Sequence, residues 1–206
     1  MIEPKKNTLI ASFFHRYILR IVKKNFQAVN FNQVNINADK SVLLLPNHYS
    51  WWDGFLIYYL NAVYLKKKFH VMILEQTGKK FFFMKYLGAY TVNKGSKDVI
   101  TSLEYTAKLL QDPQNLVLIF PQGTLYSNFT DDIKFQNGLS RVIKQAAGAF
   151  QTLFAVSFME TLQYKKPLVN INLQLHADHV MDMETLKKSF QEYYSQCKLA
   201  QGKIVV

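Results

Sequence analysis

The sequence predicts an α/β fold with a mostly parallel or mixed central sheet flanked by helices, preceded by an amphipathic N-terminal helix. Strand-like and helix-like segments alternate along the chain, which is the order that builds such sheets. The chain has 206 residues, of which 49% are hydrophobic, and no Pro/Gly/Ser-rich linker divides it. It can therefore bury one sizeable core. We expect a membrane-facing helix within residues 1–30 and a single α/β domain over residues 31–206.

The first predicted element is an amphipathic helix between residues 9 and 24. Apolar residues recur there at helical spacing, with Arg16, Arg20, Lys23 and Lys24 interleaved. His15 and Arg16 interrupt the apolar run well short of the roughly 20 residues that span a bilayer, and no signal-peptide cleavage site follows. The pattern predicts a helix lying on a membrane surface rather than a transmembrane helix. A helix that packs its apolar face on the core is the alternative, and the two are compatible.

The remaining elements follow from apolar runs and their periods. The run 42–45 predicts a buried strand. Further strands are predicted near residues 69–74, 89–92, 116–120, 153–158 and 168–175. Helices are predicted near residues 54–65, 79–87, 97–111, 138–149 and 183–199.

The positive charge is concentrated in the first half of the chain. The formal net charge is +11, of which residues 1–100 contribute +10 and residues 101–206 contribute +1. Basic clusters at residues 16–24, 66–68 and 79–85 stand beside aromatic and aliphatic residues. Such surfaces suit an anionic membrane or an acidic carrier protein, and also nucleic acid. No helix-turn-helix or RNA-binding signature is present, so nucleic acid is the weaker alternative.

The candidate chemistry begins at the exit of the first buried strand. His48 and Asp53 stand five positions apart, directly after that strand, with the loop-forming Asn47 and Ser50 nearby. A carboxylate on one imidazole nitrogen fixes the tautomer and stabilises the imidazolium that forms when the other nitrogen takes a proton. No Gly-x-Ser-x-Gly elbow occurs, and the one cysteine, Cys197, lies in a polar helix pattern. The base is therefore expected to act on a substrate hydroxyl or amine directly.

A second loop is predicted to open at the same edge of the sheet. Phe120-Pro121-Gln122-Gly123-Thr124 combines a rigid proline, a glycine that permits close backbone approach, and two hydrogen-bonding side chains. In α/β sheets, ligands collect at the carboxyl ends of the strands. Backbone N–H groups around His48 and Gly123 are the candidate donors to a developing oxyanion.

Three blocks together resemble the glycerolipid and lysophospholipid acyltransferase family, which includes 1-acylglycerol-3-phosphate acyltransferases. They are Asn47-His48-x4-Asp53, Gly88-Ala89-Tyr90-Thr91-Val92-Asn93-Lys94 and Phe120-Pro121-Gln122-Gly123-Thr124, and Leu153 to Phe158 is a candidate fourth. The resemblance covers about residues 40–160. It implies acyl transfer in membrane lipid synthesis from an acyl-CoA or acyl-carrier-protein thioester to a lysolipid, with no other cofactor and no metal. The enzyme would be peripheral, on the cytoplasmic face of the membrane.

Carried over to this chain, the resemblance assigns His48 as general base and Asp53 as its orienting residue. It implies substrate contacts for Asn47, Lys94, Gln122, Gly123 and Thr124. The chain departs from the family at Gln122, where glutamate is usual, and at Leu125, where arginine is usual. Asn93-Lys94 replaces Asp-Arg, and Phe135-Gln136-Asn137-Gly138 replaces a Phe-Lys-x-Gly pattern. Because those cations are associated with the acceptor phosphate, we expect either a different head group, such as that of an aminolipid or glycolipid, or a phosphate that is held by other lysines.

Weaker motifs and function classes complete the expectations. His176 and His179 with Asp178 and Asp182 are a minor metal alternative, and His70 with Glu75 repeats the His-x4-acid spacing inside a predicted strand, which favours a packed histidine. Trp51 and Trp52 fit either lipid contact or core packing. A catalytically silent lipid-binding relative is the main alternative function, although such a relative has no reason to keep both His48 and Asp53.

Overall fold

The computed structural model describes residues 1–93, 95, 98–146, 148–176 and 182–206. Its strands are β1 (Ala28–Phe31), β2 (Ser41–Pro46), β3 (Lys68–Leu74), β4 (Ala89–Val92), β5 (Asn115–Leu118), β6 (Phe150–Glu160) and β7 (Leu168–Leu175). Its α-helices are α1 (Thr8–Asn25), α2 (Asp53–Leu60), α3 (Glu75–Lys80), α4 (Asp98–Leu109), α5 (Gly138–Gln145) and α6 (Met183–Gln201). A π-helical turn η1 (Asn61–Leu65) continues α2, and a 3-10 helix η2 (Phe82–Leu87) follows α3.

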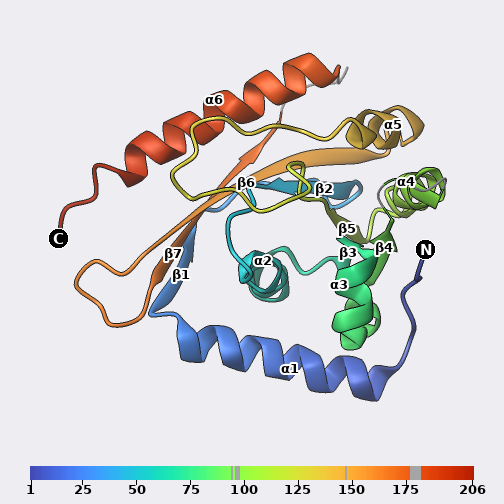
Figure 1. Cartoon of the computed structure of the whole chain (residues 1–206), viewed down its shortest axis with the longest axis horizontal. Coiled ribbons are helices and arrows are strands. Elements are labelled where there is room, and N and C mark those ends of the chain that lie inside the picture. Colours follow the sequence, from blue (N-terminus) through green and yellow to red (C-terminus); the bar gives the residue numbers. More distant parts are fainter. Residues whose placement is uncertain (94, 96–97, 147, 177–181) are drawn as a thin grey trace.

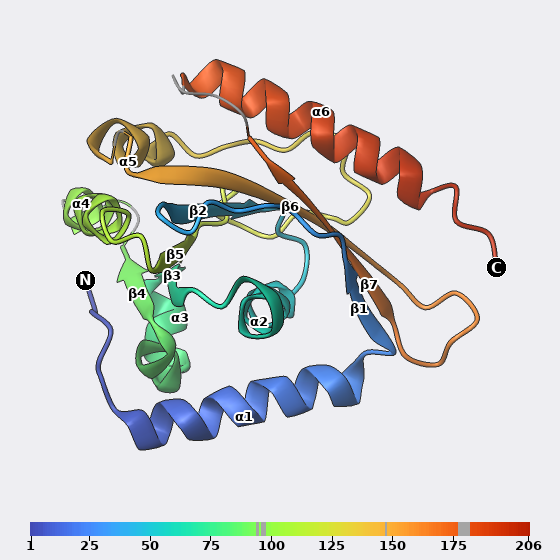
Figure 2. The same ribbon diagram turned by 180° about the vertical axis from the view of Figure 1, so that it is seen from behind.

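The described strands form one mixed sheet in the order β1-β7-β6-β2-β5-β3-β4. Neighbouring strands from β6 to β4 are parallel, whereas β7 runs antiparallel to β6 and β1 runs parallel to β7. Helices α4, α5 and α6 lie on one side of the sheet, and α1 and α2 lie on the other (Figures 1 and 2). The predicted α/β class, with a mixed sheet between helices and a separate N-terminal helix, is confirmed.

The central strand β2 contains an uninterrupted apolar run because its side chains enter a core on each face of the sheet. Leu43 and Leu45 contribute to the core beneath α5 and α6, while Val42 and Leu44 contribute to the core beneath α1 and α2. Both faces of β2 are therefore buried, as parallel sheets covered on both sides require. Its neighbours are β5 and β6, both parallel to it. The loops after β2 and β5 consequently leave the sheet at the same edge.

The N-terminal segment and α1 are tied to this sheet. Ile2 exchanges two hydrogen bonds with Thr91 of the outermost strand β4, donating to its Oγ1 and accepting from its N–H. Helix α1 then begins at Asn7, whose side chain accepts from the Ile10 N–H, and buries Ile18 and Val22 in the core. The helix is thus a wall of the domain. No helix of the described residues is long and apolar enough to cross a membrane.

Two elements differ from the sequence prediction. Strand β1 was not predicted, because it is only four residues long, contains Asn30 and lies at the edge of the sheet, where it pairs with β7. The helix predicted at 79–87 is instead α3 and η2 with a break at Phe81. Phe81 has φ −114° and ψ 68°, which is outside the helical region; its ring lies against Trp51, and the Phe83 ring stacks on Phe14.

The basic cluster at residues 66–68 has a structural role. The Lys67 ammonium donates to the carbonyls of Ala38, Lys40 and Pro113 at 3.1, 2.9 and 2.6 Å. Burial lowers the pKa of this ammonium. The cluster stands at the amino end of β3, which is the edge of the sheet opposite the loops after β2 and β5.

Gly88 stands at a position where the fold leaves no room for a side chain. It has φ +92°, and a Cβ added there would lie 1.9 Å from the Phe69 carbonyl oxygen in β3. Backbone rather than a flexible side chain would have to move. We expect Gly88→Ala to lower the free energy of unfolding by at least about 2 kcal/mol, measured by chemical denaturation.

The matched control is Gly148→Ala. Gly148 has φ +79°, but an added Cβ would meet no atom within 4 Å. It should cost only the strain of the left-handed conformation, about 1 kcal/mol. Equal losses in the two variants would show that the contact with Phe69 is unimportant.

Candidate active site

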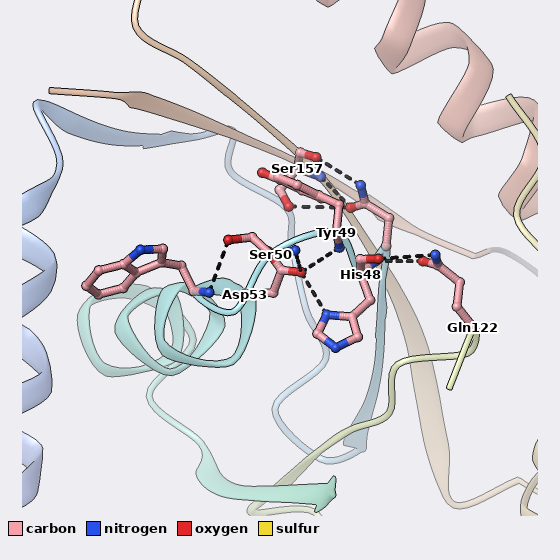
Figure 3. A network of polar contacts seen from close by, with 8 residues as sticks. His48, Tyr49, Ser50, Asp53, Gln122 and Ser157 are labelled. Atoms are coloured by element: carbon pink, nitrogen blue, oxygen red, sulfur yellow. Dashed lines mark hydrogen bonds and ion pairs between the residues drawn. The ribbon is translucent and has the colours of Figure 1, made fainter. Parts of the chain in front are cut away.

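His48 and Asp53 form the centre of the site. His48 lies in the loop after β2, and its Nδ1 is 2.7 Å from Oδ2 of Asp53, the first residue of α2 (Figure 3). The Asp53 side chain is 1% exposed, whereas that of His48 is 22% exposed. Because the carboxylate accepts a hydrogen bond from the Nδ1–H, the imidazole is held as the tautomer whose Nε2 can take a proton. The predicted base and its orienting carboxylate are therefore brought together.

Asp53 also shapes the loop that carries the histidine. The same Oδ2 atom accepts hydrogen bonds from the N–H groups of Tyr49 and Ser50, both at 2.8 Å. Ser50 Oγ accepts in turn from the Trp52 N–H at 3.1 Å. The short side chain of aspartate closes this turn at the start of α2, which explains why the acid follows the histidine by five positions.

Asn47 anchors the loop to the sheet. It is buried, its Nδ2 donates to the Ser157 carbonyl at 2.9 Å, and its Oδ1 accepts from the Ser157 N–H at 2.8 Å. The side chain thus bridges the end of β2 to β6 instead of extending into open space. Ser157 was not singled out from the sequence, since nothing in its neighbourhood signals a partner so far away along the chain.

The second loop packs directly against the first. The Phe120 ring stacks on the His48 imidazole with centroids 3.9 Å apart and planes inclined by 24°. Gln122 is fully buried, and its amide contacts the backbone of His48. Gly123 has φ +63°, and its N–H closes a tight turn onto the Phe120 carbonyl at 3.1 Å. Of the residues assigned to this loop, Thr124 is the exposed one.

The backbone donors suggested as an oxyanion hole are engaged within the loops. The N–H of His48 is bound to Gln122, those of Tyr49 and Ser50 to Asp53, and that of Gly123 to Phe120. Their hydrogens fix the loop geometry in this structure. Burial raises the pKa of the neighbouring Tyr49 phenol, and the charge of Asp53 raises it further, so this group stays neutral.

A cavity of about 840 Å³ opens beside the imidazole. Its polar lining residues include a cation, Lys80, as well as His48, Gln76, Thr77, Thr124, Gln136 and Asn137. The rest is largely apolar and is lined by side chains from both sides of the sheet edge, among them Ile18, Phe55, Val71, Met84, Leu103 and Leu139. Volumes of 300–1,000 Å³ are typical of small-molecule sites, with apolar walls and a few polar groups that orient the ligand.

Two of the weaker candidates, His70 and Asp182, have structural roles. His70 is buried in β3, where Nε2 contacts Asn115 Oδ1 at 3.2 Å, and burial lowers its pKa, so it is a packed histidine. Asp182 caps α6 by accepting from the N–H groups of Glu184 and Thr185. His179, Asp178 and Lys94 lie outside the described residues. Among those described, no group of three or more His, Cys, Asp or Glu could hold a metal ion.

The two tryptophans have different surroundings. Trp51 is exposed and lines the cavity, whereas Trp52 packs edge-on against Phe26 at 5.2 Å. Gln136, noted in the sequence only as a departure from a family pattern, lines the cavity and donates to the Gln122 carbonyl at 3.2 Å. Its role could not be predicted because it depends on how two loops meet.

Comparison with known proteins gives two findings. A protein-family model described as "Acyltransferase" matches residues 28–174. Among solved structures, the chain is similar to the 1-acyl-sn-glycerophosphate (LPA) acyltransferase PlsC from Thermotoga maritima, with a TM-score of 0.69 and 16% sequence identity. That similarity covers 95% of this chain and 83% of the other. No curated protein sequence matches.

Proposed function

Because the chain belongs to the acyltransferase family, we propose that it transfers a fatty acyl chain from an acyl-CoA or acyl-carrier-protein thioester to a hydroxyl or amine of a lysolipid, in membrane lipid synthesis. The observation that carries the proposal is the His48–Asp53 pair at the mouth of an apolar cavity. A proton acceptor beside a space that suits a lipid chain is what such a reaction needs.

The proposed reaction uses Nε2 of His48 as general base. It removes the proton of the acceptor hydroxyl or amine as that atom attacks the thioester carbonyl carbon. Asp53 stabilises the imidazolium through Nδ1–H. The tetrahedral intermediate then breaks its C–S bond, and the imidazolium returns the proton to the departing thiolate. No covalent acyl-enzyme forms, so both substrates are held together and their positioning supplies much of the rate enhancement.

Thr124 is the proposed polar contact for the reacting groups. It is exposed, lines the cavity, and follows the turn that packs against His48. Its hydroxyl can donate to a developing oxyanion, as can backbone N–H groups that are released from the loop when substrate binds. Gly123 allows this close approach because it carries no side chain.

We infer an acceptor whose head group is bound mainly by amide and hydroxyl groups, without arginine. Gln136, Asn137 and Thr124 line the cavity together with the cation Lys80, and Leu125 occupies the position where the family usually has arginine. Amide and hydroxyl groups suit hydroxylated or amine-bearing head groups, whereas phosphate monoesters favour arginine or lysine. Lysolipids of the aminolipid or glycolipid type are therefore the proposed acceptors. Lys94 remains a proposed phosphate contact should a phosphate be present.

We also propose that α1 lies on an anionic membrane, at its cytoplasmic face. Leu9 and Phe13 are 82% and 61% exposed, and Tyr17, the next residue at the same spacing of four, is also exposed. They form one stripe on the helix. Phe82 of η2 is also exposed. It lies near α1, because the ring of its neighbour Phe83 stacks on the Phe14 ring with centroids 4.3 Å apart. Arg16, Arg20, Lys23 and Lys24 are partly or fully exposed cations on the same helix, suited to anionic lipid head groups.

His48 and Asp53 give the first test of this function. Incubation of purified protein with labelled acyl-CoA or acyl-carrier protein and a panel of lysolipids should yield acylated product. We expect His48→Ala to lower kcat at least about 100-fold and Asp53→Asn to lower it less, because the amide still accepts the loop N–H groups. His15→Ala, which removes a histidine bonded to Tyr58, is the control.

The same panel tests the acceptor. Efficient and selective use of lysophosphatidate would contradict the proposed head-group preference. A wild-type protein that binds lysolipid but transfers nothing would instead indicate a silent relative. Activity that persists unchanged in His48→Ala would remove the proposed base.

The cavity gives a second test through Gly54. This residue lines the cavity in the first turn of α2, and a Cβ added there would meet no atom within 4 Å. Gly54→Leu should fill part of the space that the acyl chain uses. We expect kcat/KM for a palmitoyl donor to fall about 10-fold or more relative to an octanoyl donor.

Gly54→Ala is the matched control, because it adds only the Cβ. Both substitutions favour the helix by up to about 1 kcal/mol, so a loss of activity would not reflect unfolding. An unchanged ratio between the two donors in Gly54→Leu would place the acyl chain elsewhere.

The membrane proposal is tested by vesicle flotation. Replacing Leu9 and Phe13 by serine should weaken binding to phosphatidylglycerol vesicles at least about 10-fold, because two large apolar side chains leave the lipid interface. Leu199→Ser is the control, since this leucine is 63% exposed but lies on α6, across the sheet from α1 (Figure 1). Equal binding by wild type and the double variant, or an equal loss in Leu199→Ser, would overturn the assignment of α1.

A further inference from the structure

The side-chain amide of Gln122 makes two hydrogen bonds to the backbone of His48. Its Oε1 accepts a hydrogen bond from the His48 N–H at 2.6 Å, and its Nε2 donates to the His48 carbonyl at 3.2 Å (Figure 3). Both atoms of the side-chain amide are thus used on one residue, and Gln122 is 0% exposed. A side chain in this position has no surface left with which to touch a substrate.

The pair of hydrogen bonds requires a side chain that carries a donor and an acceptor side by side, as an amide does. One backbone donor and one backbone acceptor face the side chain, and only a group with its own acceptor and donor side by side can satisfy both. An ionised glutamate would accept from the N–H but would face the His48 carbonyl with negative charge. An apolar residue of the same length would leave the His48 N–H without a partner, at a cost of about 1–3 kcal/mol.

The second loop is itself held from behind. The Gln136 side chain donates to the Gln122 carbonyl at 3.2 Å, and the Gln136 N–H donates to the Pro121 carbonyl at 2.8 Å. On the other side, the Tyr126 N–H also donates to the His48 carbonyl, at 3.0 Å. The turn at Pro121 and Gln122 is therefore a rigid support against which the His48 backbone rests.

The histidine is held at two levels as a result. Asp53 and Phe120 fix the direction and plane of the imidazole ring. Gln122 fixes the backbone from which that ring extends. Fixing the ring alone would leave Nε2 free to shift with the loop, and displacements near 1 Å are enough to reduce turnover about 100-fold.

We propose that Gln122 is a positioning residue for the base. Its side-chain amide clamps the His48 backbone and does not bind the acceptor. This inference rests on the proposed function for its kinetic consequence, while the clamp itself has a readout that needs no activity. It also explains why an amide is suited to a position where a carboxylate is usual in the family that the sequence resembles.

The chain contains a matched control for the experiment. Gln151, at the start of β6, makes the same two-point bridge to another backbone: its Oε1 accepts from the Asn37 N–H at 2.9 Å and its Nε2 donates to the Asn37 carbonyl at 2.7 Å. Gln151 lies at the amino end of β6, at the edge of the sheet opposite His48. Gln151→Met therefore breaks a bridge of the same kind, although a more exposed one, away from His48.

The test compares Gln122→Met with Gln151→Met. We expect Gln122→Met to lower kcat about 100-fold with little change in KM, measured well below the unfolding temperature of each variant. Gln151→Met should keep kcat within about twofold of the wild type, even if thermal unfolding shows a comparable loss of stability. Equal loss of kcat in both, or a wild-type kcat in Gln122→Met, would overturn the proposal.

Hydrogen exchange provides the readout that is independent of turnover. The His48 backbone amide should exchange faster in Gln122→Met than in wild type and should be unaffected in Gln151→Met. If wild type transfers no acyl group to any acceptor, the proposed function fails while this measurement still decides the clamp. Unchanged exchange at His48 in Gln122→Met would overturn the clamp whatever the activity.

Gln122→Glu adds a signature that a general loss of stability would not produce. A protonated carboxyl carries one donor and one acceptor, so it can replace the amide, whereas the carboxylate cannot. Burial raises the pKa of such a carboxyl above its usual range. The titratable groups of the adjoining loop are His48, Asp53 and Tyr49, and the variant keeps all three. We therefore expect kcat of Gln122→Glu to fall as pH rises, because the new carboxyl then loses the proton that lets it replace the amide. A Gln122→Glu pH profile parallel to that of wild type would contradict the amide requirement.

Discussion

The parallel pairing of β2 with β5 is the constraint on which the site depends. The register Val42 to Leu116 sets the two strands side by side in the same direction, and the Ile119 N–H extends the pairing to the Leu44 carbonyl. Two loops separated by some seventy residues in sequence therefore leave the sheet next to each other. The stack of Phe120 on His48 and the bridge from Gln122 both follow from that arrangement. A shift in this register would separate the base from the loop that supports it.

Within the site, the polar groups of the loops are used to hold the loops. A buried backbone N–H or carbonyl needs a partner, and in a loop it cannot find one in a strand or helix. Asp53 supplies such partners to Tyr49 and Ser50, and Gln122 supplies them to His48. Asn47 does the same for Ser157, where β6 continues beyond the end of its pairing with β2. The fixed position of His48 is thus a by-product of satisfying buried backbone groups. Several residues that the sequence presents as substrate contacts are consequently better placed as supports.

The sequence was informative wherever one short segment determines the outcome. The apolar run at Val42–Leu45 identified the central strand, and the local turn between His48 and Asp53 identified the pair. It was uninformative where distant backbones meet. The role of Gln122 depends on a carbonyl and an N–H that belong to every residue, so no side-chain pattern marks them. Strand β1 was missed for a related reason, because its place at the sheet edge is set by β7 and not by its own four residues.

Helix α1 joins the proposed membrane contact to the cavity. Its exposed stripe begins at Leu9, whereas Ile18 on another face of the same helix lines the cavity and is fully buried. Phe14 stacks on Phe83, which also lines that cavity. Any tilt of α1 on a lipid surface would therefore move two cavity walls, Ile18 directly and Phe83 through its stacked ring. Since Ile2 and Lys5 hold the segment before the helix to Thr91 and Lys85, the helix is restrained at its start and on its buried face. The proposed lipid contact and part of the cavity wall thus belong to one element, α1.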